Sequence, residues 1–261
     1  MDLELSATAR LYHWMQSGPL GCTLRPSLAV IITLVLFDID GTLIRSGGSG
    51  RWAMSAAAGE LFGCPEMFEG LSFAGAVDSG IVAHAMAAAG IDPTPRQMGL
   101  MRARYLRRLS RRLREKPGSV CPGVEDMIAA LSGRAQIGLL TGNWERGARI
   151  KLAAHGLGSV FSGCVGAYGS DASERNALIP HAHRRARRRW DGLARIVVVG
   201  DTPADIRCAR AGADLLGPAG PEIIAVGVET GFASAEDLSA AGPDLQVKDL
   251  VSGHAALMDL I

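Results

Sequence analysis

A continuous apolar run, LAVIITLVLF from Leu28 to Phe37, constrains the fold of this chain more than any other feature. It is too short to cross a bilayer. It is rich in β-branched residues and lacks the alternation of a half-exposed strand, so it predicts a strand that is buried on both faces. Such strands belong to parallel sheets that are covered by helices.

Further apolar runs alternate with helical patterns along the chain. Strands are predicted at Gln136–Leu140, Ile196–Val199 and Ile223–Val228, with a weaker one near Val160–Val165. Helices are predicted at Pro122–Leu131, Arg146–His155 and Pro203–Ala211, the last ending before Gly212. This alternation predicts an α/β fold with a doubly wound, parallel, Rossmann-like sheet.

Polar residues follow three of the predicted strands. Asp38 follows the first, Thr141 ends the second in LLTGN, and Asp201 follows the third in VVVGDTPAD. Ligands of such sheets bind at the carboxyl ends of the strands. We therefore expect these three residues to lie at one edge of the sheet and to form a site there.

Asp38 is followed two residues later by Asp40. In an extended chain both side chains point to the same side, and close carboxylates repel each other unless a cation lies nearby. Mg²⁺ favours one or two carboxylates together with water and phosphate oxygens. We therefore expect a metal site, with Asp201 as a further ligand; the alternative is a simple turn, because Asp-Gly is a common turn pair.

A long insertion separates the first two strands. Phe37 and Gln136 are 99 positions apart, whereas a parallel crossover needs roughly a dozen residues. Residues 51–117 carry helical patterns and are predicted to form a helical module above the strand ends. The expected organisation is an N-terminal extension at 1–27, a core at 28–50 and 118–261, and this inserted module.

Composition limits the partners and the location. The formal net charge of +1 indicates no charged partner, and the five cysteines lack the spacing of a disulfide framework or a zinc site, which predicts reduced thiols in a cytoplasmic protein. The chain does not begin with the basic segment of a secretory signal, and we expect no membrane partner.

Two arginine-rich runs hold 13 of the 27 Lys and Arg residues: RARYLRRLSRRLREK and RRARRR, the latter at Arg184–Arg189. Their favoured interpretation is a pair of solvated helix faces. Aromatic residues do not interleave with the arginines, so nucleic acid is an unlikely partner.

Three motifs, FDIDGTL, LLTGN and VVVGDTPADIRCARAG, together resemble the signature of the haloacid dehalogenase-like (HAD) hydrolase superfamily, over roughly residues 31–250. The chain looks most similar to the phosphoglycolate-phosphatase-like branch. The resemblance implies that the inserted module is a helical cap. It also implies a Mg²⁺-dependent phosphatase that hydrolyses a small phosphorylated metabolite through an aspartyl-phosphate.

The resemblance assigns roles to individual residues. Asp38 would be the nucleophile, and Asp40 would protonate the leaving alcohol and then activate water. The metal would be held by the Asp38 carboxylate, the Asp40 backbone carbonyl and Asp201. Asp205 would be either a partner of the metal through water or a surface acid on its helix. The phosphate-binding residues would be Gly41, Thr42, Thr141, Gly142, Asn143 and Arg175.

One element of the family pattern is missing. A lysine is expected some two dozen residues before the second aspartate motif, where this chain has GSDASERNALIP. Arg175 can carry the same charge; the alternative is a surface arginine. The nearby Lys151 is expected to be exposed to solvent.

Asp40 favours phosphate ester hydrolysis, because the branch that attacks carbon lacks this acid. Two alternatives remain open: a phosphomutase acting on a sugar phosphate, and a catalytically weak relative whose basic helices bind an acidic partner. Residues near Arg51 and the segment SFAGAVDSG, Ser72 to Gly80, are expected to face the substrate. The substrate and the oligomeric state stay open.

Overall fold

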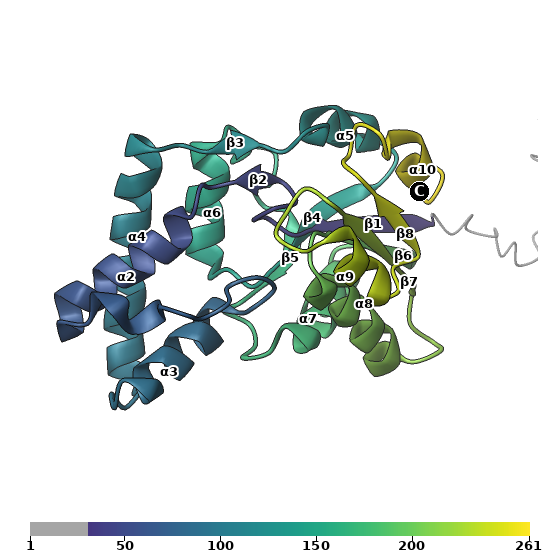
Figure 1. Cartoon of the computed structure of the whole chain (residues 1–261). Coiled ribbons are helices and arrows are strands. Elements are labelled where there is room, and N and C mark those ends of the chain that lie inside the picture. Colours follow the sequence, from purple (N-terminus) through teal and green to yellow (C-terminus); the bar gives the residue numbers. More distant parts are fainter. Residues whose placement is uncertain (1–30) are drawn as a thin grey trace, which may run out of the picture. The chain divides into compact units, whose positions relative to one another are not determined.

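The computed structural model describes residues 31–261, and Figure 1 shows their arrangement. The predicted N-terminal extension at residues 1–27 and the start of the apolar run at residues 28–30 lie outside the described residues. Among the described residues, no helix is both long and apolar enough to span a membrane.

A six-stranded parallel sheet forms the centre of the described chain, in the order β5-β4-β1-β6-β7-β8. The strands are β1 (Ile32–Phe37), β4 (Gln136–Thr141), β5 (Val165–Tyr168), β6 (Leu193–Gly200), β7 (Glu222–Val228) and β8 (Leu245–Val247). The predicted α/β class with a doubly wound parallel sheet is confirmed.

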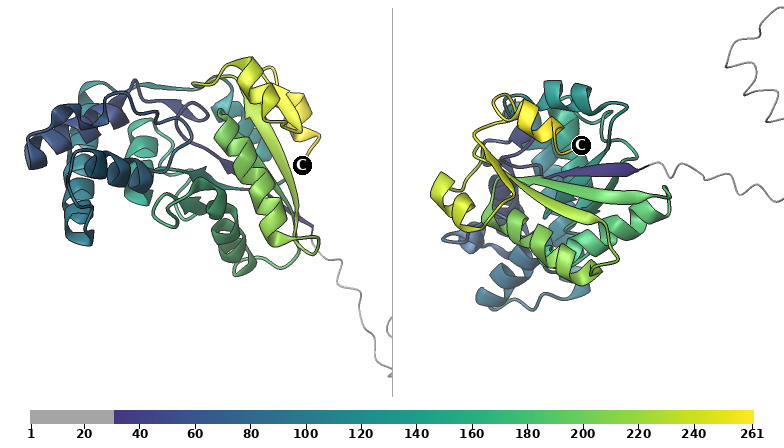
Figure 2. Two further views of the ribbon diagram at one scale, coloured as in Figure 1. Left: turned by 60° about the horizontal axis from the view of Figure 1, so that its bottom comes forward. Right: turned by 90° about the vertical axis from the view of Figure 1, so that its right-hand side faces the viewer.

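Helices surround this sheet. Those that follow the inserted module are α5 (Val124–Leu131), α6 (Glu145–Ala154), α7 (Leu178–Arg187), α8 (Pro203–Leu216), α9 (Ala235–Ala240) and α10 (His254–Met258), with a short 3₁₀ helix η2 (Arg175–Ala177). In Figure 1, α5 and α10 lie above the sheet, whereas α7 and α8 lie below it. Figure 2 shows the same layers from two further sides.

Strand β1 is buried on both faces, as its continuous apolar sequence predicts. Val35 and Phe37 pack into one apolar cluster with side chains from α5 and α6, and Leu34 and Leu36 pack into a second cluster with side chains from α7 and α8. Alternate residues of a strand point to opposite faces, so a strand between two helical layers needs apolar side chains at every position.

The strand register places the expected site residues at one edge. Phe37, the last residue of β1, is paired with Leu139 of β4 and with Val199 of β6. The chain continues from these positions to Asp38, Thr141 and Asp201 respectively. From β1 the chain adds β4 and β5 on one side of the sheet and then β6, β7 and β8 on the other side. Open α/β sheets bind ligands at the strand where this direction changes.

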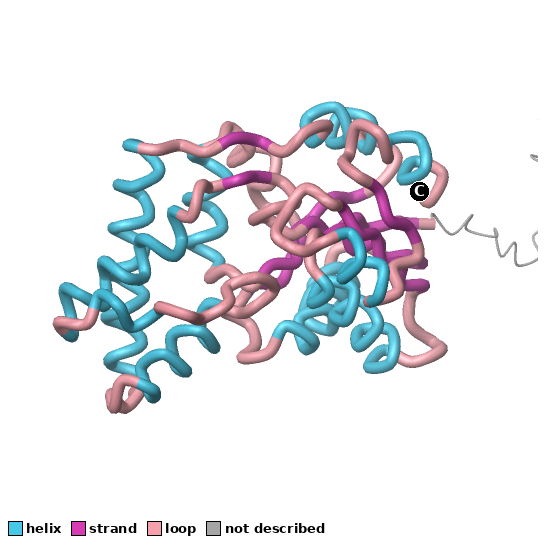
Figure 3. Tube along the Cα trace, in the orientation of Figure 1, coloured by secondary structure: helices cyan, strands magenta, loops and turns pink. Residues whose placement is uncertain are grey.

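The inserted module contains three helices and a short 3₁₀ helix: α2 (Ser49–Phe62), η1 (Pro65–Phe68), α3 (Asp78–Ala88) and α4 (Pro95–Glu115). They enclose an apolar cluster, to which α4 contributes Met101, Tyr105, Leu109 and Leu113 and which also includes Trp144 of the loop before α6. We call this module the cap. Figure 3 shows its helices beside the strands of the sheet.

Both connections of the cap pass through a two-stranded antiparallel ribbon, β2 (Ile44–Arg45) with β3 (Ser119–Val120). The sequence analysis did not predict this ribbon or β8. The weak strand predicted near Val160–Val165 exists, but it lies further along the chain, because β5 begins at Val165 and ends at Tyr168.

Helix α8 is longer than predicted and continues through Gly212 to Leu216. A Cβ at Gly212 would lie 2.6 Å from the nearest side-chain atom of Ile179. The glycine therefore lets α7 approach α8 closely, and it does not end the helix.

Candidate active site

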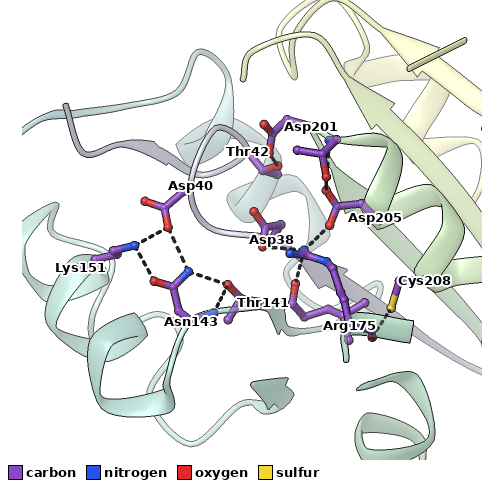
Figure 4. A network of polar contacts seen from close by, with 12 residues as sticks. Asp38, Asp40, Thr42, Thr141, Asn143, Lys151, Arg175, Asp201, Asp205 and Cys208 are labelled. Atoms are coloured by element: carbon purple, nitrogen blue, oxygen red, sulfur yellow. Dashed lines mark hydrogen bonds and ion pairs between the residues drawn. The ribbon is translucent and has the colours of Figure 1, made fainter. Parts of the chain in front are cut away.

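Three buried carboxylates meet beyond the ends of β1 and β6. They belong to Asp38, Asp201 and Asp205, of which the last lies in the first turn of α8. One carboxylate oxygen of each lies within 4.8 Å of those of the other two. Figure 4 shows this cluster and its partners.

Two hydrogen bonds fix the Asp201 carboxylate of this cluster. Thr42 donates its hydroxyl to Oδ1 at 3.0 Å, and the Phe232 backbone N–H donates to Oδ2 at 3.2 Å. A Cβ at Gly41 or at Gly231 would lie 2.3 or 1.7 Å from Oδ2, so only glycine fits at both positions. Burial, with the charges of Asp38 and Asp205, raises the pKa of Asp201 well above its ordinary value.

Arg175 is the cation of this cluster. It lies in η2 and is 8% exposed, and its Nη2 donates to Asp38 Oδ1 at 2.8 Å and forms an ion pair with Asp205. Burial raises the pKa of Asp38 to about 6, although the charge of Arg175 opposes this rise.

The surface alternatives for Arg175 and Asp205 are wrong. Asp205 is fully buried and forms a capping box with Thr202 at the start of α8, which explains why it points inward. Arg175 follows it into the core because two buried carboxylates attract its charge.

The donor set fits a divalent metal ion. The guanidinium of Arg175 pairs with two of the three buried carboxylates, so the cluster retains unbalanced negative charge that a hard cation bound by oxygen ligands would neutralise. The cluster contains the expected Asp38 and Asp201. Its third carboxylate comes from Asp205, whereas the side chain of Asp40 has other partners.

Asp40 lies on the cap side of Asp38. Its carboxylate accepts hydrogen bonds from Ser46 Oγ and Asn143 Nδ2, both at 3.0 Å, and forms an ion pair with Lys151. Burial alone would raise the pKa of Asp40, but the charge and hydrogen bond of Lys151, with the hydrogen bonds of Asn143 and Ser46, lower it below its ordinary value. The two acids of the DIDGT motif therefore have separate cations, as Figure 4 shows.

The expectation that Lys151 is exposed is wrong, because its residue exposure is only 4%. It lies on the buried face of α6 with Gly147, Ala148 and Leu152. A Cβ at Gly50, at the start of α2, would lie 3.5 Å from Lys151 Nζ, so the amino group lies next to the backbone of the cap. Lys151 is buried by contacts between α6 and the cap. The sequence of α6 alone does not predict these contacts.

The loop between β4 and α6 positions Asn143. Its backbone N–H and its side-chain Nδ2 both donate to Thr141 Oγ1, at 3.3 and 2.9 Å, and its side-chain oxygen accepts from Lys151. A Cβ at Gly142 would lie 1.9 Å from the carbonyl oxygen of Ala76 in the cap, so this position also requires glycine.

A cavity of about 370 Å³ lies between the core and the cap at this site. Asp38, Asp40, Gly142, Asn143 and Arg175 line it, whereas Gly41 and Thr42 lie next to Asp201. From the cap it receives Arg51, the segment from Ser72 to Ala76, Asp78 and Tyr105. Its size suits a small molecule.

Three ionisable residues that line this cavity were not among the predicted catalytic, phosphate-binding or metal-binding residues: Asp78, Tyr105 and Lys151. Asp78 lies in the SFAGAVDSG segment that was expected to face the substrate, so a signal existed for it. Tyr105 gave no signal of its own in the sequence, because its spacing in α4 matches that of the apolar Met101 and Leu109.

The chain matches one protein family, and many solved structures have a similar fold. The family model described as haloacid dehalogenase-like hydrolase matches residues 35–210. This region begins in β1 and ends within α8, so it includes the three strand ends and the cap. No curated protein matches the chain closely enough to count as a relative.

Three solved structures illustrate the shared fold. CbbY from Rhodobacter sphaeroides, in complex with phosphate, is 17% identical with a TM-score of 0.64, over 85% of this chain and 96% of that one. A predicted phosphatase from Clostridium acetobutylicum is 18% identical with a TM-score of 0.64, over 88% and 99%. A predicted phosphoglycolate phosphatase from Haemophilus somnus 129PT is 18% identical with a TM-score of 0.58, over 87% and 98%.

Proposed function

Because the chain belongs to the haloacid dehalogenase-like hydrolases, we propose that it is a Mg²⁺-dependent phosphatase that hydrolyses a small phosphorylated metabolite. One observation carries the proposal: Asp38, which belongs to a buried cluster of three carboxylates, lines a cavity together with a fourth acid, Asp40, that has its own lysine partner. This arrangement supports a nucleophile, a proton shuttle and a metal site at one place.

Asp38 is the proposed nucleophile. Its carboxylate oxygen attacks phosphorus, the bond from phosphorus to the ester oxygen breaks, and the leaving alcohol takes a proton from Asp40. Asp40 then takes a proton from the water that attacks the aspartyl-phosphate, which releases inorganic phosphate and restores Asp38.

Asp40 needs a different protonation state in each half of this cycle. Lys151 keeps Asp40 ionised in the free protein, which is the form that takes a proton from water. A bound phosphate is an anion and would raise the pKa of a neighbouring acid, which favours the protonated form that the first step requires.

Charge neutralisation is the proposed role of the remaining residues. Arg175 offsets the charge of Asp38, in place of the lysine of the family pattern. The carboxylates of Asp38, Asp201 and Asp205 are the proposed holders of Mg²⁺, with the Asp40 carbonyl as a further candidate. When bound, the ion would neutralise the phosphate charge and orient the phosphate for attack. Gly142 and Asn143 are proposed to contact the phosphate oxygens.

Phosphate release from p-nitrophenyl phosphate and from a panel of metabolite esters, measured with and without Mg²⁺, tests the proposal. The wild type should release phosphate only with the metal, and Asp38→Asn should abolish the release. Asp191→Asn is the matched control, because Asp191 is exposed and lies just before β6, at the opposite end of the sheet. An active Asp38→Asn variant would refute the nucleophile assignment.

The same assay separates the alternatives. A phosphomutase would convert a sugar phosphate into an isomer without net release of phosphate. A catalytically weak binding protein would release none, and would retain nucleic acid at low salt through the arginines at 184–189.

We also propose that the protein is cytoplasmic. Four cysteines, at positions 64, 121, 164 and 208, are free thiols in the structure, as is usual in a reducing compartment.

A further inference from the structure

We propose that Tyr105 and Asp78 of the cap form a subsite for a hydroxyl group of the leaving alcohol. The substrates would then be monophosphates of polyhydroxy alcohols or sugars that carry no second anionic group. This inference rests on the proposed phosphatase function and adds the class of substrate to it.

Tyr105 lines the cavity and carries an unsatisfied donor. It belongs to α4, is fully buried and lines the cavity, and its hydroxyl has no hydrogen-bond partner among the described residues. Its ring packs edge-on against Trp144, with centroids 5.5 Å apart, so the ring is fixed in place. Burial, with the charges of Asp78 and Asp40, raises the pKa of Tyr105 well above its ordinary value, so the hydroxyl keeps its proton. A buried donor without an acceptor costs free energy that a ligand oxygen would recover.

Asp78 presents an acceptor to the same cavity. It lies in the first turn of α3 and is 7% exposed, and its Oδ2 accepts from the Trp144 backbone N–H at 2.8 Å. No described residue donates to its other oxygen. Tyr105 and Asp78 both contact Trp144, one through its ring and one through its backbone, which brings them to the same part of the cavity wall.

A hydroxyl group is the ligand that satisfies both residues. It can accept a hydrogen bond from Tyr105 and donate its own proton to Asp78. A carboxylate or second phosphate could accept from Tyr105 but would be repelled by Asp78. An ammonium group would suit Asp78 but could not accept from Tyr105.

The basic side chains of the cavity already have oxygen partners, which leaves none to receive a second anion. Arg175 contacts Asp38 and Asp205, and Lys151 contacts Asp40.

Arg51, at the rim, donates to the carbonyl oxygens of Phe68 and Leu71 and stacks on the Phe73 ring at 4.1 Å. Among the described residues, Arg51, Lys151 and Arg175 are the lysines and arginines that line the cavity. A substrate with two anionic ends would have to displace one of these contacts.

The test compares kcat/KM for sugar and polyol monophosphates, such as glycerol 3-phosphate, with that for phosphoglycolate, 3-phosphoglycerate and phosphoethanolamine. The best substrate should be a hydroxyl-rich monophosphate. Tyr105→Phe keeps the ring and removes only the hydroxyl, so it should lower kcat/KM for that substrate about tenfold. The ratio of kcat/KM for that substrate to kcat/KM for p-nitrophenyl phosphate, which has no alcohol hydroxyl, should therefore fall. Tyr168→Phe is the matched control, because Tyr168 is also buried but does not line the cavity.

Asp78→Asn provides an independent variant. Asparagine can still accept from the Trp144 backbone N–H, but it no longer repels anions, so the rate with phosphoglycolate should rise relative to that with the best polyol phosphate. A wild type that prefers phosphoglycolate, or a Tyr105→Phe variant with unchanged substrate ratios, would overturn the subsite while p-nitrophenyl phosphate is still hydrolysed. Absence of any ester hydrolysis would instead overturn the proposed function, and the subsite with it.

Discussion

Replacement of Asp78 by asparagine should stabilise the protein at neutral and alkaline pH. Burial raises the pKa of Asp78 from its ordinary value of 3.8 to about 6, although Lys151 and the Trp144 backbone N–H partly offset this rise and Asp40 adds to it. The folded protein therefore holds a carboxylate in a position that favours the neutral acid. Asparagine has nearly the same shape, is neutral and keeps the hydrogen bond to Trp144.

The size of the effect follows from the rise in pKa. A rise from 3.8 to about 6 corresponds to about 3 kcal/mol, since each pKa unit is worth about 1.4 kcal/mol. Between these two pH values the folded protein binds the proton more tightly than the unfolded chain does. The wild type therefore loses stability as the pH rises through this window, and above it the loss is complete. Asp78→Asn should raise the free energy of unfolding by about 3 kcal/mol at about pH 8, and the gain should vanish near the lower end of the window.

Urea unfolding of both proteins, followed by circular dichroism from about pH 4.5 to about pH 8, measures this difference. Asp249→Asn is a control of opposite sign, because the hydrogen bonds from the backbone and side chain of Ser252 lower the pKa of Asp249. That variant should lose stability above the ordinary pKa of an aspartate. A stability difference for Asp78→Asn that does not change with pH, or a loss of stability at about pH 8, would refute the reasoning.

Three further variants test other parts of the site. Lys151→Met should lower the free energy of unfolding by about 3 kcal/mol, because it leaves Asp40 without its cation. Urea unfolding measures this loss. Lys116→Met is the control, because Lys116 is exposed and its replacement should change the free energy of unfolding little. Gly75→Ala should cost about 1–3 kcal/mol by urea unfolding, because its Cβ would lie 2.3 Å from that of Ala204; Gly70→Ala shares the positive φ but meets no atom within 4 Å and should cost less. Mg²⁺ should raise the melting temperature of the wild type, and Asp201→Asn should abolish this rise in a thermal scan.

The sheet and the acidic cluster were largely predictable from the sequence. A strand buried on both faces needs apolar residues throughout, so the run ending at Phe37 was unambiguous. The residues that follow such strands are fixed by the topology, which brought Asp38, Thr141 and Asp201 to one edge. The short strands of the ribbon were not predictable, because two residues carry no periodicity.

The cap side of the site was much less predictable. Lys151 is buried because it pairs with Asp40 and lies next to Gly50 of α2, and these contacts are distant in the sequence. Tyr105 occupies an apolar position of α4 by spacing, yet its side chain lines the cavity. Both assignments depend on how the cap lies against the core, which local patterns do not encode.

The ribbon of β2 and β3 makes the cap a replaceable insertion, which we call the cassette. Ile44, where the chain leaves the core, is paired with Val120, where it returns, so the two ends of the insertion are neighbours at the spacing of adjacent strands. Helices of another length or number can be inserted between these two residues without changing any strand of the main sheet. Substrate choice can then diverge through the cassette, while the acids at the strand ends keep the same chemistry.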